Sequence, residues 1–221
     1  MGQHGRMTTL PLSPDELLTT TRAVRKRLDL ARPVPMDLIR ECLEIAVQAP
    51  TGSNAQNWHW IVVTDPDKRR AIGEYYRRAF AAYAESRAFA GALHQDDSER
   101  ADVQRRVGDS ASYLAEHIDE VPVHVIPCLD VPGELPAANQ AGLWASLHPA
   151  VWNFALAARA RGLGTSWTSL HLAFEREVAE LLGLPATIRQ GALIPTAYYT
   201  GDTFKPARRA PLDTVLHHDA W

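Results

Sequence analysis

The chain has 221 residues, a formal net charge of −3 and 46% hydrophobic residues. This composition is typical of one compact globular domain, and it argues against disorder and against a strongly basic protein that binds nucleic acid. No apolar run approaches the ~20 residues that a membrane-spanning helix needs. The two cysteines lie far apart and form no C-x-x-C motif. This excludes a disulfide scaffold and a cysteine-rich zinc site. It predicts a cytoplasmic protein in which both cysteines are free thiols buried in the fold.

The first part of the chain carries a clear helix start. Ser13 can cap a helix, Pro14 suits its first turn, and Glu16 completes a capping box. The residues before it lack the apolar core of a signal peptide, and we expect 1–12 to be a flexible segment ahead of a single domain, 13–221. The expected elements here are a helix over 13–27, a helix over 36–48, an irregular loop over 50–54 and a β-rich strand over 58–64.

The rest of the chain alternates helical and strand-like stretches of uneven length. This pattern alone allows both an α+β and an α/β fold. The final 21 residues have no obvious periodicity, which predicts a segment packed on something else, such as a partner subunit. The expected elements are a mostly helical region over 68–119, a strand over 121–129, a loop over 132–140, a helix over 149–161, a strand over 165–170, a helix over 175–182, a strand over 190–200 and a tail over 201–221.

Motifs for several common chemistries are absent from the sequence. Gly162-Leu163-Gly164 lacks the third glycine of a dinucleotide-binding fingerprint and follows a helix, and neither a P-loop, a G-x-S-x-G motif nor a zinc-binding H-E-x-x-H occurs. Two basic clusters remain, one at 22–27 and one at 205–209. Each alone is typical of a solvated surface, whereas together they could converge on one anion, because arginine matches phosphate oxygens with a planar fork. We expect Trp58, Trp60 and Trp152 to be core residues.

The order of four segments resembles the nitroreductase family of FMN-dependent oxidoreductases, over about 17–216. Thr21-Arg22-Ala23-Val24-Arg25 is similar to the family's Arg-Arg-Ser-x-Arg opening, with Thr21 and Ala23 replacing an Arg and a Ser. Pro50-Thr51-Gly52-Ser53-Asn54-Ala55-Gln56-Asn57-Trp58 is similar to its Pro-Ser-x-x-Asn-x-Gln-Pro-Trp. The helix over 153–158 followed by Gly162-Leu163-Gly164-Thr165 resembles a buried helix and its Gly-Leu-Gly strand, and 205–213 resembles the closing Lys-Pro-Arg-Arg-Pro-Leu element.

The resemblance implies an α+β fold with a mixed, mainly antiparallel sheet flanked by helices. It also implies an intertwined homodimer in which residues 201–221 form a C-terminal arm on the partner subunit. Two FMN sites would lie between the subunits, each built from both chains. The resemblance implies neither a nucleic-acid partner nor a membrane partner.

The resemblance also implies a set of cofactor-binding residues. Arg22, Ala23 and Arg25 would lie at the FMN phosphate, joined by Lys205, Arg208 or Arg209 from the tail. Pro50, Thr51, Gly52, Asn54 and Gln56 would come from the other subunit to the isoalloxazine ring. Thr168 and Ser169 would approach the N5 and O4 edge with backbone amides. No catalytic side chain and no metal is implied.

The activity that the resemblance implies is ping-pong hydride transfer. NADPH or NADH would pass a hydride to flavin N5 and leave, and a nitroaromatic, quinone or related small acceptor would then occupy the same place. A non-catalytic FMN-binding protein remains an alternative, as does another flavin reaction such as dehalogenation. A purely helical interaction domain without flavin is a third.

Overall fold

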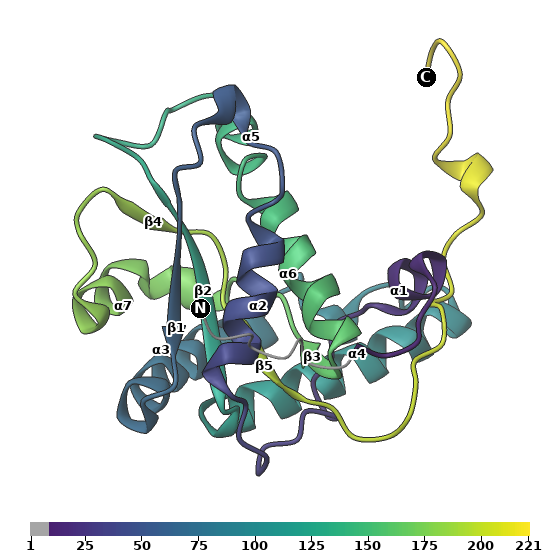
Figure 1. The fold of residues 1–221 in the computed structure, drawn as a ribbon. Coiled ribbons are helices and arrows are strands. Elements are labelled where there is room, and N and C mark those ends of the chain that lie inside the picture. The colour runs from purple at the N-terminus through teal and green to yellow at the C-terminus, as the bar shows by residue number, and fades with distance from the viewer. Residues whose placement is uncertain (1–8) are drawn as a thin grey trace.

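The computed structural model describes residues 9–221 and has one central sheet between layers of helices (Figure 1). The helices are α1 (Pro14–Thr20), α2 (Met36–Ala46), α3 (Pro66–Ala84), α4 (Ser98–His117), α5 (Gln140–Trp144), α6 (His148–Ala160) and α7 (Glu175–Leu182). The strands are β1 (Trp58–Val63), β2 (Val123–Asp130), β3 (Leu163–Thr165), β4 (Ile188–Gln190) and β5 (Ile194–Tyr198). Within residues 9–221, no helix is long and apolar enough to cross a membrane.

Strand β2 is the centre of the sheet. It pairs antiparallel with β1 along one side, where Trp58 lies opposite Leu129, and with both β5 and β4 along the other. Strand β3 then pairs antiparallel with β5. Seven of the eight β2 residues are buried, as expected for an apolar strand that is covered on both faces. The expected α+β class with a mainly antiparallel sheet is confirmed.

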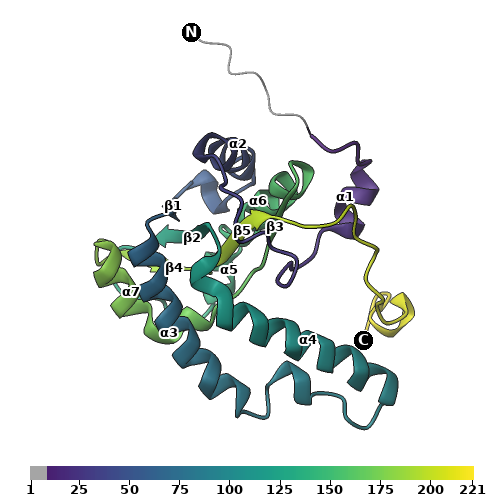
Figure 2. The ribbon, with the colours of Figure 1, turned by 90° about the horizontal axis from the view of Figure 1, so that it is seen from below.

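The two faces of the sheet have separate hydrophobic cores. Helices α2 and α6 cover one face, where Leu38 and Phe154 are fully buried against Val125. Helices α3, α4 and α7 cover the other face, where Ile72 and Ile126 are fully buried (Figure 2). The alternation along β2 sends successive side chains to opposite cores. Burial of apolar surface, at about 25 cal/mol per Å², is the dominant favourable contribution to folding, and it is concentrated in these two layers.

The first basic cluster lies outside a helix, so the prediction of a helix over 13–27 was wrong at its C-terminal end. The capping box forms as expected, since Glu16 N–H donates to Ser13 Oγ at 3.2 Å and Ser13 N–H to Glu16 Oε2 at 2.8 Å. The helix ends at Thr20. Val24 then donates its N–H to the Thr165 carbonyl at 2.8 Å and buries its side chain in the second core. Pairing with β3 outweighs the local helical pattern.

Three other boundaries also differ from expectation. The strand expected over 165–170 is β3, which begins two residues earlier, at Leu163, and ends at Thr165. It ends there because regular pairing stops at Thr165 and resumes only in an isolated bridge from Thr168 to Leu193. The strand expected over 190–200 is two strands, β4 and β5. A helix, α5, begins at Gln140 where the loop was expected to end.

The two ends of the chain are held differently. Most of the expected flexible segment 1–12 lies outside the described residues, but Leu10 N–H donates to the Ala160 carbonyl at 2.7 Å. At the other end, Arg27 donates from Nε to the Thr200 carbonyl at 2.6 Å and from Nη1 to the Thr203 carbonyl at 2.9 Å. Beyond Pro211 the tail runs away from the body with exposed apolar side chains, including Leu212 and Leu216 (Figure 1). Exchange of this arm with a partner stays a prediction.

Candidate functional site

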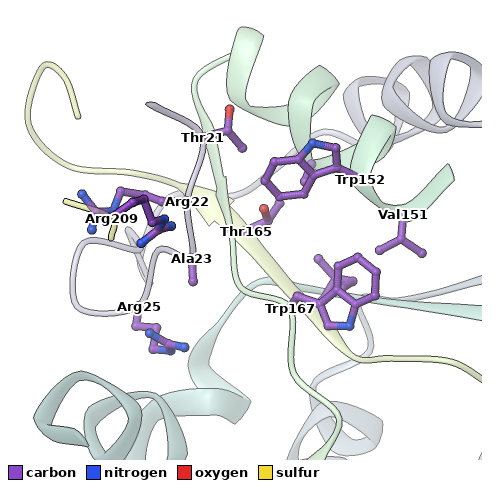
Figure 3. A pocket seen from close by; sticks show the side chains of 11 residues that line it. Thr21, Arg22, Ala23, Arg25, Val151, Trp152, Thr165, Trp167 and Arg209 are labelled. Carbon is purple, nitrogen blue, oxygen red and sulfur yellow. The ribbon is translucent and has the colours of Figure 1, made fainter. Parts of the chain in front are cut away.

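A cavity of about 370 Å³ lies where the segment after α1, strand β3, helix α6 and the tail meet (Figure 3). One side is basic and the opposite side is aromatic and aliphatic. Its lining residues are Thr21, Arg22, Ala23, Arg25, Val151, Trp152, Ala155, Thr165, Trp167, Ile194 and Arg209. The two basic clusters of the sequence therefore do converge.

The segment 22–25 is held in this cavity by its contact with β3. Ala23 forms an isolated parallel bridge with Thr165. The approach needs a glycine at 164, because a Cβ atom there would lie 2.9 Å from Val24 Cβ. Gly164 thus provides close packing for the basic segment, whereas Gly162, with φ of +79°, shapes the turn after α6.

The tail reaches the same cavity from the other end of the chain. Arg22 donates from Nη1 to the Lys205 carbonyl at 3.2 Å. Arg209, four residues further on, lines the cavity beside Arg22 (Figure 3). Three guanidinium groups therefore share one opening, and such planar forks match phosphate or carboxylate oxygens.

Arg25 is the most enclosed of the three arginines. It is partly buried and donates from Nη1 to Ser110 Oγ of α4 at 3.3 Å. Burial lowers the pKa of Arg25, although the guanidinium stays charged at neutral pH. A desolvated cation with a neutral hydrogen-bond partner is stabilised by a bound anion.

Of the predicted phosphate residues, the structure brings Arg22, Ala23, Arg25 and Arg209 together in the cavity. Arg208 lies outside it, forms an ion pair with Glu99 of α4 and lines a neighbouring groove. Lys205 contributes a backbone carbonyl to Arg22, and its side chain is exposed.

The predicted ring-binding loop lies elsewhere on the same chain. Pro50, Gly52, Asn54 and Gln56 are exposed and Thr51 is half-buried, and none of the five lines this cavity. The loop is ordered by its own bonds, from Gln56 N–H to Thr51 Oγ1 at 3.1 Å and from Gln56 Nε2 to Asn54 Oδ1 at 2.9 Å. Its role at a site completed by a second chain stays a prediction.

Thr168 and Ser169 follow the cavity wall at the end of β3. The Thr168 N–H donates to the Leu193 carbonyl at 3.1 Å, so this amide is already engaged. Its hydroxyl lies 3.1 Å from the Tyr76 hydroxyl. Ser169 is exposed. Approach of these two backbones to a flavin stays a prediction.

Two tryptophans of the cavity escaped the sequence analysis. Trp152 was expected in the core, and this was wrong, because its side chain is 40% exposed on the cavity side of α6. Trp167 is 39% exposed and lies on the same side of the cavity as Trp152, opposite the arginines (Figure 3). Trp58 and Trp60 do pack against the first core as expected. The signal available for Trp167 was its position directly after Gly-Leu-Gly-Thr-Ser. The chain leaves the sheet there, so the side chain is not held in the core.

The cavity offers no side chain for acid–base or nucleophilic work. Its eleven lining residues include no Asp, Glu, His, Cys or Lys. Burial raises the pKa of Cys42 and Cys128 to about 12, which leaves both thiols inert. Among residues 9–221, no cluster of His, Cys, Asp and Glu could hold a metal ion. What the cavity does offer is three arginines beside two tryptophans, a lining that suits a planar ligand with an anionic group.

Comparison with known proteins identifies the family of this chain. A model of the Nitroreductase family matches residues 18–198. NADH dehydrogenase of Thermus thermophilus is 31% identical over 94% of this chain and 97% of its own length. The chain belongs to the Nitroreductase family, and it is an oxidoreductase.

Two solved structures share the fold. The FMN and NADPH-dependent nitroreductase NfnB from Sphigopyxis sp. strain HMH superimposes with a TM-score of 0.68 at 22% identity, over 95% of this chain and 100% of its own. Oxidized iodotyrosine deiodinase bound to FMN and 3-iodo-L-tyrosine gives a TM-score of 0.69 at 19% identity, over 94% of this chain and 99% of its own. The expected nitroreductase-like fold is confirmed.

Proposed function

We propose that the protein binds FMN and uses NADPH or NADH to reduce small acceptors, of which nitroaromatic compounds and quinones are the expected classes. The observation that carries this proposal is the meeting of Arg22, Arg25 and Arg209 at one cavity beside Trp152 and Trp167. The family membership and the activities of the relatives support it.

The residues present fit FMN in charge and in size. A phosphate monoester carries about −1.5 to −2 charges at neutral pH, which three guanidinium groups can neutralise. The cavity volume of about 370 Å³ falls within the range of ligand pockets, roughly 300–1,000 Å³. The apolar wall formed by the tryptophans and Ile194 suits a planar ring. Arg22, Arg25 and Arg209 would hold the phosphate.

The remaining contacts would come from a second chain. We place Pro50, Thr51, Gly52, Asn54 and Gln56 of a partner protomer at the isoalloxazine ring, with Thr168 and Ser169 of the first. The exposed position of the 50–56 loop and the exposed apolar tail favour a homodimer, because both surfaces would be covered in it.

The division of chemical work follows from the lining residues. When bound, FMN supplies the hydride chemistry. The protein supplies the rest: the arginines bind the anionic end, and the tryptophans exclude water from the reacting face. Reductant and acceptor would reach the flavin through the same opening in turn, and for this reason we expect ping-pong kinetics.

The test is reconstitution with FMN followed by NADPH oxidation with a nitroarene or a quinone as acceptor. We expect acceptor-dependent turnover, with parallel lines in double-reciprocal plots at several acceptor concentrations. Riboflavin is the matched control cofactor, because it lacks only the phosphate. FMN-saturated protein that oxidises neither NADPH nor NADH would contradict the proposal and leave the non-catalytic FMN-binding protein and another flavin reaction as the alternatives.

A further inference from the structure

A second, larger groove adjoins the cavity. Its volume is about 930 Å³, and it lies between α4 and tail residues 206–211. The groove and the cavity share Arg22, Ala23, Arg25 and Arg209, so the three arginines form a common wall between the two spaces. A ligand in the groove can therefore extend into the cavity past the proposed phosphate site.

The groove carries more positive charge than one phosphate needs. Six arginines line it, against two carboxylates, Asp97 and Glu99. Asp97 caps α4, accepting from the N–H groups of Glu99 and Arg100 at 3.1 Å each. Glu99 pairs with Arg208. Both carboxylates are thus engaged, and five arginines remain.

Two of those five, Arg100 and Arg106, belong to the groove alone. Both project from α4 and neither lines the cavity. Arg100 donates from Nη2 to His94 Nε2 at 2.8 Å, a bond to a ring nitrogen that accepts only when the histidine is neutral. Within residues 9–221, Arg106 has neither an ion pair nor a side-chain hydrogen bond. The α4 wall therefore presents two cations that form no ion pair with a carboxylate of the described residues.

We propose that Arg100 and Arg106 bind the 2′-phosphate of NADPH, and that the enzyme consequently prefers NADPH to NADH. The inference rests on the proposed function. The nicotinamide must reach the cavity, and the groove adjoins the cavity at the shared arginines, so a nucleotide that enters through the groove has its adenosine end toward the α4 wall. The 2′-phosphate is the charged group of that end, and two arginine forks match its oxygens.

The experiment compares Arg106→Ala and Arg100→Ala with wild-type, FMN-loaded protein. Arg105→Ala is the matched control, because Arg105 is the adjacent arginine of α4, pairs with Asp102 and does not line the groove. Calorimetry with adenosine 2′,5′-bisphosphate and with adenosine 5′-phosphate gives a readout independent of turnover. Steady-state kinetics give KM for NADPH and NADH.

We expect wild type to bind the bisphosphate more tightly than the monophosphate. Each groove variant should lose about ten- to a hundredfold in bisphosphate affinity, with a matching rise in KM for NADPH, because charge-assisted hydrogen bonds are involved. The KM for NADH should rise much less, and Arg105→Ala should behave as wild type. Arg106→Lys should recover part of the loss.

Three results would overturn the inference. The first is wild-type protein that binds both adenosine phosphates with equal affinity, and the second is a variant whose KM rises as much for NADH as for NADPH. The third is a variant that loses FMN affinity while its affinity for the bisphosphate is unchanged. The last would place these arginines at the FMN phosphate. Wild-type protein that takes up no FMN would refute the proposed function alone, because the bisphosphate titration still decides the inference on the protein as purified.

Discussion

Arg22 donates a hydrogen bond from Nη1 to the carbonyl oxygen of Lys205, 3.2 Å away and 183 residues later in the chain. This bond joins the segment after α1 to the first part of the tail, and it brings Arg209 to the side of the cavity that Arg22 and Arg25 occupy. The site therefore depends on the placement of the tail as well as on its charges.

The first prediction concerns the charges themselves. Arg25→Ala and Arg209→Ala should each weaken FMN binding by about ten- to a hundredfold, because each removes one charge-assisted contact of roughly 1.5–3 kcal/mol to the phosphate. Fluorescence titration of apo protein with FMN measures the loss. Excess FMN should restore much of the activity, and riboflavin should bind wild type and variants alike.

Lys26→Ala is the control for this series, because Lys26 is an exposed cation of the same segment and lines neither the cavity nor the groove. A variant that keeps wild-type FMN affinity would show that its arginine is solvated. A variant that FMN saturates without restoring activity would place the arginine in the chemistry or in folding.

The second prediction concerns the placement of the tail. The guanidinium carbons of Arg27 and Arg159 lie 4.1 Å and 5.0 Å from the ring centroid of Phe204. Such contacts contribute about 0.5–2 kcal/mol each. Phe204→Ala should therefore loosen the tail and reduce FMN affinity about five- to tenfold, although Phe204 lines neither the cavity nor the groove.

Phe204→Tyr keeps an aromatic face and should bind FMN nearly as wild type does. The same titration compares the two variants. Equal FMN affinity of Phe204→Ala and wild type would mean that the contacts of Arg27 and Arg159 with Phe204 do not position Arg209.

The third prediction tests whether each site is built from two chains. Asn54→Ala and Arg209→Ala should each impair the site they belong to. Co-expression of the two variants with different tags yields mixed dimers, in which one site carries both changes and the other carries neither. Randomly mixed protein should then recover about a quarter of wild-type sites, counted by FMN retained.

Mixed dimers that retain no more FMN than the two parent variants would place both residues in a site within one chain. Sedimentation of wild-type protein provides the companion check. A flavin-bound, active monomer at working concentration would contradict the homodimer.

The fourth prediction concerns stability against pH. His124 and His171 are fully buried, and burial lowers the pKa of each to about 4. In the unfolded chain their pKa is near 6.5. Between about pH 6.5 and pH 4 the unfolded state binds these protons and the folded state does not, so the free energy of unfolding falls as the pH falls through this window.

Each histidine should account for a loss of about 3 kcal/mol across the window. Within residues 9–221, neither ring nitrogen of His171 has a hydrogen bond of ordinary geometry, and burial outweighs the opposing effect of the neighbouring Gln190 side chain on its pKa. Because the two histidines contribute equally, His171→Leu should remove about half of their combined decrease in the free energy of unfolding. Urea unfolding at about pH 7.5 and about pH 4.5 measures it. His217→Leu, in the exposed tail, is the control, and an unchanged pH dependence in His171→Leu would contradict the assignment.

The sequence predicted more of the site than of the local structure around it. The motifs grouped Arg22 and Arg25 with Lys205, Arg208 or Arg209, and only the fold shows that Arg209 is the tail residue that shares their cavity. The helix over 13–27 was mispredicted because the pairing of Val24 with Thr165 is a contact over a long sequence separation, which local periodicity does not record. Trp152 was mispredicted because an apolar helix leaves open which of its residues faces a cavity.

The arginines of the groove show the same limit. Arg100, Arg105 and Arg106 lie close together in a polar helical stretch and look alike in the sequence. Only the position of α4 beside the tail separates the two that line the groove from the one that does not.

The visible spectrum of the purified protein, followed by anaerobic addition of NADPH, tests the proposed function most directly. We predict a flavin spectrum, cofactor released by acid that migrates as FMN at about one per chain, and bleaching of the flavin band that a nitroarene or quinone then reverses. Protein that stays colourless after incubation with FMN, or that releases FAD, or whose flavin band NADPH and NADH both leave unchanged, would contradict it.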